Sequence, residues 1–340
     1  MPTRWNPPEI GGKGMTAERR FDLLVAGELN PDILVFDPAA RPAFARVETI
    51  VEAIQMEIGS SSAIAACGAA RLGLRTAFVG VVGDDAFGRF MLDALDGAGI
   101  DVSGCRIDPT VPTGATVVLT HGADRANMTA LGAIDRLRAD DIPRELLAAS
   151  RHLHIGSTYL QPALTADLPE LFAEARSLGL STSFDCNWDA TEMWGSEIDE
   201  LLREADLFLP NLEEARRITG RTAAPAAAGE LLRRATGGRE PGRPFTLAVK
   251  HGAGGALAMR GSWEYEVAEA AVLPVEVVDT TGAGDSFDAG FLYGTLAGWP
   301  LRDTLELAVA CGSISVGGIG GTAAQPTLEA AREALAAAGR

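Results

Sequence analysis

The sequence predicts a three-layer α/β/α fold with a doubly wound, mostly parallel β-sheet and a small additional β-sheet that forms a lid. Short β-rich runs alternate with segments of helical periodicity along most of the 340 residues. The predicted strands are almost continuously apolar, as in parallel sheets that helices cover on both faces. Residues 33–58 and 113–133 break this rhythm and have the pattern of extended strands, so we expect them to form the lid.

The alternating segments can be placed in order along the chain. Strands are expected at Phe21–Ala26, Thr76–Val82, Thr116–Thr120, His152–Ile155, Thr182–Asp185, Leu207–Leu209, Phe245–Lys250 and Val275–Val278. Helices are expected at Ser61–Leu72, Phe87–Ala98, Ala166–Leu178, Leu212–Thr219 and Gly229–Ala235. Residues 220–244 contain a helix and a surface loop, so we do not interpret them as a domain linker. Residues 307–328 are uncharged but rich in glycine, which favours a buried helix followed by a loop over a membrane span.

The domain organisation follows from the same patterns. Residues 1–20 consist of proline, glycine and charged residues without periodicity, which predicts a flexible tail. Residues 21–340 then form a single large domain, into which the two lid segments are inserted.

Composition excludes several classes of function. Acidic residues outnumber basic residues 46 to 29, which gives a net charge of −17. Such a surface repels nucleic-acid backbones and anionic lipid, so we expect no nucleic-acid partner and no membrane association. The four cysteines form no CxxC motif or Cys/His cluster, and no apolar signal segment opens the chain. These features indicate a cytoplasmic protein with free thiols.

The most informative segment is residues 279–291, DTTGAGDSFDAGF. An expected strand leads into a turn with Gly282 and Gly284, and an apolar helix follows. Glycines let the backbone approach a ligand closely, and the free N–H groups of a new helix favour an anion. Asp285 would repel that anion unless it accepted a proton from an attacking hydroxyl. The alternative is an acidic N-terminal residue on a glycine-punctuated helix. The segment is neither a Rossmann fingerprint nor a Walker A loop.

Other polar residues follow expected strands or begin helices. Asn30 and Asp32 follow the first strand, where they can bind vicinal hydroxyls or simply form a turn. Asp185 and Asn187 end a strand at the edge where doubly wound sheets bind ligands. Asn211 and Glu214 have the spacing of a capping box, which is the structural alternative to a ligand site.

Several motifs in order resemble the ribokinase-like (PfkB) carbohydrate kinase family. The segment DTTGAGDSF at 279–287 resembles its second signature. The other matching segments are GELNPD at 27–32, AARLG at 69–73, GVVGDDAFG at 80–88, PNLEEARRITG at 210–220 and VKHGAGG at 249–255. The resemblance covers roughly residues 21–338. It implies a ribokinase-like fold and transfer of the ATP γ-phosphate to a hydroxymethyl group of a small sugar, sugar acid or nucleoside.

The resemblance also implies roles for individual residues. Asp285 matches the general base, which we expect nearby helix N–H groups to keep ionised, and Gly282, Ala283 and Gly284 match the anion hole. The substrate-binding positions are Asn30, Asp32, Gly59, Ser60, Asp185 and Asn187. The positions on the ATP side are Asn211, Glu214, Lys250, Gly252 and Gly255, with Glu214 organising Mg²⁺ through water. Asp279 and Thr281 match a monovalent-cation site found in several members, which makes K⁺ a further candidate cofactor.

The chain departs from the family pattern in one substrate-binding segment. At residues 59–64, GSSSAI, Ser60 stands at a family glycine and Ile64 at a family asparagine that helps to bind substrate. Ser61 and Ser62 are candidates to replace the lost contact. A sugar kinase is the leading interpretation, with a nucleoside kinase and a non-catalytic sugar or nucleotide sensor as alternatives. Family members often pair their lids, so we expect a homodimer.

Overall fold

Eight strands form the main sheet, in the order β14-β13-β12-β11-β10-β9-β1-β4. The computed structural model describes residues 19–37, 48–121, 124–195, 197–240, 242–262 and 264–340. The strands are β1 (Phe21–Ala26), β4 (Thr76–Val79), β9 (Ser150–Ile155), β10 (Ser181–Phe184), β11 (Leu207–Phe208), β12 (Phe245–Lys250), β13 (Ala256–Gly261) and β14 (Tyr265–Ala270). From β4 to β12 neighbouring strands are parallel, whereas β13 and β14 are antiparallel.

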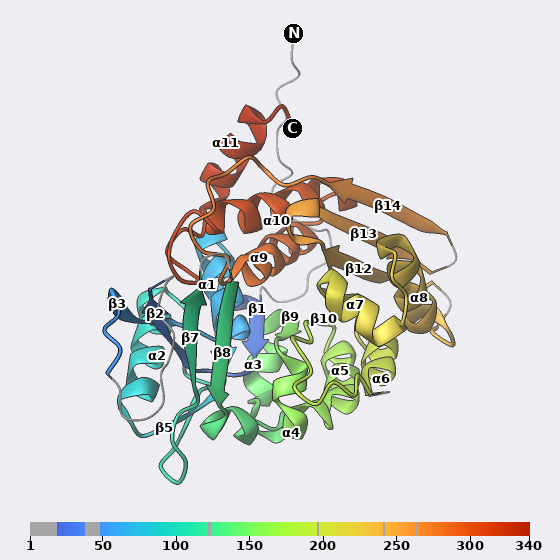
Figure 1. Cartoon of the computed structure of the whole chain (residues 1–340). Helices are drawn as coiled ribbons and strands as arrows, with labels where there is room; N and C mark the ends of the chain where they lie inside the picture. The colour runs from blue at the N-terminus through green and yellow to red at the C-terminus, as the bar shows by residue number, and fades with distance from the viewer. Residues whose placement is uncertain (1–18, 38–47, 122–123, 196, 241, 263) are drawn as a thin grey trace.

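Helices cover both faces of this sheet, which confirms the three-layer prediction (Figure 1). One face packs against α1 (Ser61–Leu72), α2 (Ala86–Gly97), α9 (Ala283–Leu296), α10 (Leu301–Ser315) and α11 (Leu328–Ala337). The other face packs against α3 (Arg144–Ala148), α4 (Pro162–Thr165), α5 (Leu168–Ser177), α6 (Glu197–Glu204), α7 (Leu212–Thr219) and α8 (Ala224–Thr236). Helix α8 begins five residues before the expected start, since Pro225 is compatible with a first helical turn.

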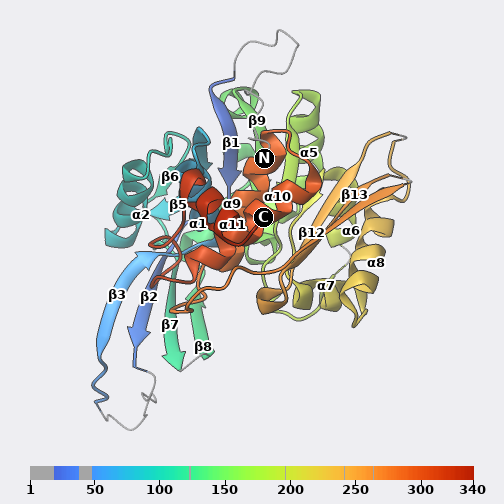
Figure 2. The same ribbon diagram turned by 90° about the horizontal axis from the view of Figure 1, so that it is seen from above.

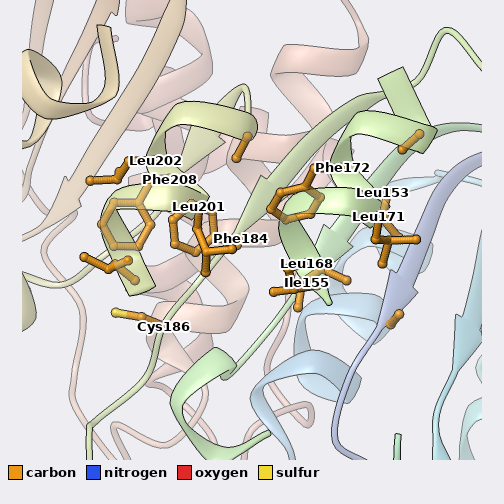
Figure 3. Close-up of a cluster of buried hydrophobic side chains, with 14 of the residues drawn as sticks. Leu153, Ile155, Leu168, Leu171, Phe172, Phe184, Cys186, Leu201, Leu202 and Phe208 are labelled. Carbon is orange, nitrogen blue, oxygen red and sulfur yellow. The ribbon is translucent and has the colours of Figure 1, made fainter. Parts of the chain in front are cut away.

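Aromatic side chains anchor the second of these layers (Figure 3). Phe184 of β10 stacks on Phe208 of β11 with 4.3 Å between ring centroids, and Phe172 of α5 lies 6.3 Å from Phe184. All three rings are fully buried. Burying such a side chain stabilises the fold by about 1.5–3 kcal/mol, so this cluster holds the carboxyl ends of β10 and β11 in place.

The two segments that broke the sequence rhythm supply a second, four-stranded sheet in the order β3-β2-β7-β8. Its strands are β2 (Pro31–Phe36), β3 (Ala53–Ile58), β7 (Ala115–His121) and β8 (Asp124–Ala130). Figure 2 shows these strands projecting away from the helical layers. These strands fall in or next to the predicted lid segments 33–58 and 113–133, whereas residues 38–47 and the expected tail at 1–18 lie outside the described residues.

The structure differs from the strand predictions in three places. Val275–Val278 forms no strand, because the main sheet ends at β14 and these residues cross from that edge to α9 without a partner strand. Conversely, β13 and β14 were missed, since their small and charged residues carry little strand signal outside the hairpin. The expected strand Thr76–Val82 divides at Gly80 into β4 and β5 (Val81–Gly83), and β5 pairs with β6 (Arg106–Asp108).

No helix in the described part of the chain has both the length and the apolar character required to cross a membrane. The uncharged stretch after Leu307 comprises the end of the buried helix α10 and a glycine-containing loop that leads to α11.

The contact between α9 and α10 depends on Gly290. A Cβ atom at this position would lie 2.8 Å from Ala308 Cα and 3.1 Å from the Leu307 carbonyl oxygen. We therefore expect Gly290→Ala to lower the free energy of unfolding by about 1–3 kcal/mol, because overpacking outweighs the gain in helix propensity.

Gly229 in α8 provides a matched control, since a Cβ atom there would meet nothing within 4 Å. Gly229→Ala should stabilise the protein by up to about 1 kcal/mol. Urea unfolding of both variants measures the difference. Equal effects of the two substitutions would contradict the proposed close packing of α9 on α10.

Candidate active site

The candidate site lies where the order of the main sheet reverses, between β1 and β9. After β1 the next strand of the main sheet, β4, is added on one side, whereas β9 and then β10 are added on the other side. Ligands of doubly wound sheets bind at such a switch point, beyond the carboxyl ends of the strands. The loops after β1, β9 and β10 and the end of β12 meet here, together with the N-termini of α1 and α9.

Helix α9 begins with the predicted glycine turn. Gly282 has φ 72°, and a Cβ atom there would lie 2.6 Å from Gly321 Cα, so a side chain would not fit. No side chain caps the helix, which leaves its first turn suited to an anionic ligand. This geometry is consistent with the expected anion hole at Gly282, Ala283 and Gly284.

Asp279 and Thr281 stabilise the turn that precedes α9. Asp279 Oδ1 accepts hydrogen bonds from the Thr281 N–H at 2.9 Å and from its hydroxyl at 2.8 Å. Asp279 Oδ2 accepts a hydrogen bond from the Gly320 N–H at 2.9 Å. The two side chains therefore have a structural role, and their participation in a monovalent-cation site stays a prediction.

Asp285 lies in the first turn of α9 and is partly exposed, as a group that reacts with a substrate has to be. Withdrawal of its carboxyl group from water raises its pKa to about 7. The nearby ammonium of Lys250 and a hydrogen bond from Ser61 act in the opposite direction, while Asp185 and Glu28 raise the pKa further. The expectation that helix N–H groups keep Asp285 fully ionised was therefore wrong, because desolvation and like charges outweigh them.

Lys250 ends β12 and points into a buried cluster of carboxylates. Its Nζ atom lies 2.5 Å from Asp185 Oδ2 and 3.0 Å from Asp288 Oδ2. Its side chain is only 11% exposed. Burial alone would lower the pKa of Lys250, but the facing carboxylates raise it well above its ordinary value. Lys250 is thus a permanently charged ammonium under the start of α9.

Asn211 and Glu214 form the capping box that the sequence suggested as a structural alternative. The Asn211 side chain accepts a hydrogen bond from the Glu214 N–H at 2.9 Å, and Glu214 Oε2 accepts one from the Asn211 N–H at 2.8 Å. Burial raises the pKa of the Glu214 carboxyl to about 7, and the charge of Asp185 adds to this shift. A direct role of the pair in binding Mg²⁺ stays a prediction. The described residues contain no group of three or more His, Cys, Asp or Glu side chains arranged as a metal site.

The predicted substrate residues after β1 lie between the two sheets. Asn30 is buried, and its Nδ2 group is 3.5 Å from Thr116 Oγ1 of β7. Gly59 lies against Asp32, since a Cβ atom there would be 2.2 Å from Asp32 Oδ1. The close fit of Gly59 therefore positions the Asp32 carboxylate at the junction of the two sheets.

Ser60 has a structural task at the start of α1. Its hydroxyl donates to the Glu28 carbonyl at 2.5 Å and accepts from the Ala63 N–H at 2.9 Å, which caps the helix. Its φ of 68° is a conformation that glycine adopts at little cost. Ser60 therefore keeps the positive φ that glycine favours, although its side chain differs from that of the family glycine.

Ile64 is buried and packs against Gly282 and Gly321. A Cβ atom on Gly321 would lie only 2.4 Å from Ile64 Cδ1. The side chain thus fills space beside the glycine turn of α9. The departure from the family asparagine supports the packing of that turn.

Asp185 and Asn187 lie together after β10, as predicted. The Asp185 carboxylate accepts a hydrogen bond from the Asn187 N–H at 2.8 Å, and Asn187 has a positive φ of 58°. The Asn187 Nδ2 group donates to Ser157 Oγ at 3.0 Å and is 3.5 Å from Ser61 Oγ. Asn187 therefore links the loops after β9 and β10 to α1.

The sequence analysis missed three polar residues of the candidate site, namely Glu28, Ser157 and Asp288. Glu28 and Ser157 follow buried strands directly, and Asp288 lies one helical turn after Asp285. A search for every polar residue that follows a buried strand would have found the first two. Asp288 carries no such signal, because an acidic residue within a helix is usually exposed.

A pocket of about 620 Å³ lies beside Ala283 and Gly284 at the start of α9. Residues from the end of β12 and the turn after it form one wall, and residues from α9 and α10 another. The lining comprises Lys250, Gly252, Ala253, Gly255, Val272, Leu273, Pro274, Val275, Val277, Thr280, Ala283, Gly284, Phe287, Val309, Gly312, Ser313 and Val316. Lys250, Gly252 and Gly255 thus line a largely apolar pocket, whereas Asn211 and Glu214 do not.

Comparisons with known proteins identify a family model and several similar chains. The family model described as pfkB family carbohydrate kinase matches residues 22–328. The chain is 34% identical over 285 residues to a fructokinase of Klebsiella pneumoniae, which covers 79% of this chain and 88% of that relative. It is 31% identical over 277 residues to a 2-dehydro-3-deoxygluconokinase of Bacillus subtilis (strain 168). That match covers 78% of this chain and 82% of the relative.

A similar fold is found in a solved structure from E. coli, a chain called a ribokinase II in complex with ATP and Mg²⁺. The TM-score is 0.79 with 23% sequence identity, and the match covers 93% of this chain and 99% of the other. This similarity supports the ribokinase-like fold.

The Lys250 cluster leads to a testable prediction about stability. Lys250→Met should lower the free energy of unfolding at pH 8 by about 3–5 kcal/mol, because the Asp185 carboxylate stays buried without its cation. Without Lys250, burial raises the folded-state pKa of Asp185 above its unfolded value of about 3.9. The variant should therefore regain stability as the pH falls towards 4 and lose it as the pH rises through the folded-state pKa.

Urea unfolding between pH 5 and 8 measures this effect. Arg302→Met, which removes an exposed ion pair with Glu306, serves as the control and should change little at any pH. A loss of stability in Lys250→Met that does not vary with pH would show that the lysine contributes through packing alone.

Proposed function

The chain belongs to the PfkB family of carbohydrate kinases, and we propose that it transfers the γ-phosphate of ATP to a hydroxymethyl group of a small sugar. The observation that carries this proposal is the place of Asp285. It directly follows Ala283 and Gly284, which line a largely apolar pocket of about 620 Å³, and it is close enough to the polar groups of Ser61, Lys250 and Asp185 for them to shift its pKa. A base in that position can reach a hydroxyl on one side and a phosphoryl group on the other.

ATP fits the pocket for chemical reasons. The apolar walls formed by Val272, Val309 and Val316 suit a purine, and Lys250 with the N-terminus of α9 suits the phosphates. Asn211 and Glu214 would hold Mg²⁺ through water near this end of the pocket. Bound Mg²⁺ would neutralise negative charge on the phosphates. The ATP and Mg²⁺ of the E. coli relative support this assignment.

The remaining chemistry comes from the protein. Gly282, Ala283 and Gly284 direct backbone N–H groups at the phosphoryl group that is transferred. Asp285 accepts the proton of the attacking hydroxyl, while the sugar is held by Asn30, Asp32, Asp185 and Asn187. The fructokinase and the 2-dehydro-3-deoxygluconokinase relatives support a ketose or a keto sugar acid as the substrate class.

We expect ADP release from Mg-ATP in the presence of one substrate class in a panel of ketoses, pentoses, sugar acids and nucleosides, assayed with and without K⁺. Asp285→Asn should reduce kcat/KM about 10²–10⁴-fold, because the general base is lost. In the wild type, kcat/KM should fall about tenfold per pH unit below pH 7, because burial raises the pKa of Asp285 to about 7 and only the ionised form accepts a proton.

Asp303→Asn, in the exposed first turn of α10, is the control and should retain wild-type activity. Turnover of a nucleoside but of no sugar would contradict the sugar assignment. Thermal stabilisation by a sugar or ATP without any turnover would favour a non-catalytic sensor. Unchanged activity in Asp285→Asn would contradict its role as the base.

We further propose that the second sheet mediates a homodimer. The register of its four strands places Ile33, Met56, Val117 and Met128 in one row, and Val35, Ile54 and Leu119 follow in the next row on the same face. Leu34 and Val118, on the opposite face, are buried. The face that carries these two rows is accessible, with Ile54 64% and Met128 55% exposed. An apolar sheet face of this kind fits a second copy of itself.

Met128→Lys should convert a dimer into a monomer of 35.5 kDa, because it places a charge on this apolar face. Met193→Lys is the control, since Met193 is 79% exposed but lies outside the second sheet. Sedimentation velocity distinguishes the two masses. A dimer that persists in Met128→Lys, or a wild-type monomer at all concentrations, would rule out this interface.

A further inference from the structure

Glu28 is a buried carboxylate at the switch point of the main sheet, and the proposed reaction leaves it without a role. It is only 2% exposed. Its Oε1 atom accepts hydrogen bonds from the Ser62 N–H at 3.2 Å and the Ser157 hydroxyl at 2.8 Å. Its Oε2 atom accepts from the Ser62 hydroxyl at 2.6 Å and from Gln161 Nε2 at 3.3 Å. Each oxygen thus faces one N–H group that can only donate.

Glycines bring these groups together. A Cβ atom on Gly27 would lie 2.0 Å from Ser62 Oγ, and one on Gly156 would lie 2.3 Å from the same atom. The loops after β1 and β9 therefore contact the N-terminus of α1 directly, with Glu28 between them. This close packing requires glycine at both positions, because any side chain there would collide with Ser62.

Hydrogen bonds continue from Glu28 to Ser61, a neighbour of Asp285. Ser157 Oγ accepts from Asn187 Nδ2 at 3.0 Å, and the same Nδ2 group lies 3.5 Å from Ser61 Oγ. Ser61 is also the residue whose hydroxyl lowers the pKa of Asp285. The hydrogen bonds therefore join Glu28, Ser157, Asn187 and Ser61, which come from β1, β9, β10 and α1, and Ser61 stands beside the proposed base at the start of α9.

The direction of each hydrogen bond is determined by groups at fixed positions. Asn187 Oδ1 accepts from the Trp188 N–H at 2.7 Å, so the Nδ2 group has to face Ser157 and Ser61 as a donor. Ionised Glu28 can only accept, so the Ser157 hydroxyl donates to it and presents a lone pair to Asn187. Ser61 accepts from Asn187, and its proton is then free to point at Asp285.

We propose that Glu28 is a positioning residue whose carboxylate orients the hydrogen-bond chain through Ser157, Asn187 and Ser61, so that the Ser61 hydroxyl donates to Asp285. The inference rests on the proposed role of Asp285 as general base. Glu28 acts on the reaction through these neighbours, without itself touching the atoms that react. The same geometry holds Asn187 in place to receive a sugar hydroxyl.

Charge provides a second link between the two carboxyl groups. The charged groups that act on Asp285 are Lys250 from β12, Asp185 from the end of β10 and Glu28 from the end of β1, while Asp288 lies on its own helix. Lys250 lowers the pKa of Asp285, and Asp185 and Glu28 raise it. Glu28 thus affects Asp285 in two opposite ways, through its charge and through the hydrogen-bond chain.

This opposition makes the inference testable with two variants. Glu28→Gln removes the charge, and its amide oxygen can still accept from Ser62 and Ser157, so the chain keeps its direction. The acidic limb of the pH profile of kcat/KM should then move to lower pH by roughly 0.5–1 unit. Ser157→Ala keeps the charge but breaks the chain. Its acidic limb should move to higher pH by a similar amount, with a lower kcat.

Ser61→Ala provides the reference for the size of the upward shift, because it removes the last donor directly. Gln161→Met, which contacts Glu28 Oε2 outside the chain, controls for general disturbance and should leave the limb in place while lowering stability. If Glu28→Gln does not fold, the shift in Ser157→Ala still decides the matter.

Acidic limbs that coincide with the wild type in folded Glu28→Gln and Ser157→Ala, or that move in the same direction, would overturn the inference. That outcome is distinct from failure of the proposed function. An inactive Asp285→Asn with unshifted Glu28 and Ser157 variants rejects the positioning role alone, whereas a fully active Asp285→Asn rejects the general base itself.

Discussion

The central constraint on this structure is a group of carboxyl side chains that lie close together, shielded from water, beside the ammonium group of Lys250. Glu28, Asp185, Glu214 and Asp288 are all buried, and Asp285 lies beside them at the edge of the site. Lys250 is the cation that contacts Asp185 and Asp288. Burial raises the pKa of Glu214 and of Asp285 to about 7, and the negative charge of Asp185 adds to both shifts. A carboxyl group with such a pKa can take up and release a proton near neutral pH, as a general base has to.

The fold tolerates this accumulation of charge because two large apolar layers support it. The rings of Phe172, Phe184 and Phe208 pack together at β10 and β11 (Figure 3). On the other face of the sheet, α9 packs closely on α10 through Gly290. These contacts fix the backbone on which the charged side chains stand. Hydrogen bonds from Ser62, Ser157 and Gln161 then satisfy the Glu28 carboxylate, so that its burial leaves no unpaired charge.

Two kinds of surface meet at the start of α9. On one side lies the apolar pocket between β12, α9 and α10, and on the other lie hydroxyl, amide and carboxylate groups from the loops after β1, β9 and β10. The second sheet extends from the polar side. Its inner face carries Asp32 and the buried Leu34, whereas its outer face is apolar and accessible. The two faces of the same short strands thus differ in polarity and in accessibility.

The sequence by itself determined the layered α/β class, the ends of α1, α7, β1 and β12, and the importance of the glycine turn before Asp285. Those features depend on local periodicity, strand composition and turn chemistry, which a short segment contains in full. The capping box of Asn211 and Glu214 belongs to the same group, because both partners lie within one helical turn. The tertiary structure alone decided the antiparallel hairpin of β13 and β14, the unpaired course of Val275–Val278 and the pairing of Lys250 with Asp288. It also decided the contacts of Glu28, whose donors lie 34 to 133 residues away along the chain. Strand pairing, burial and pKa are properties of neighbours in space, and no local pattern in the sequence specifies which residues those neighbours are.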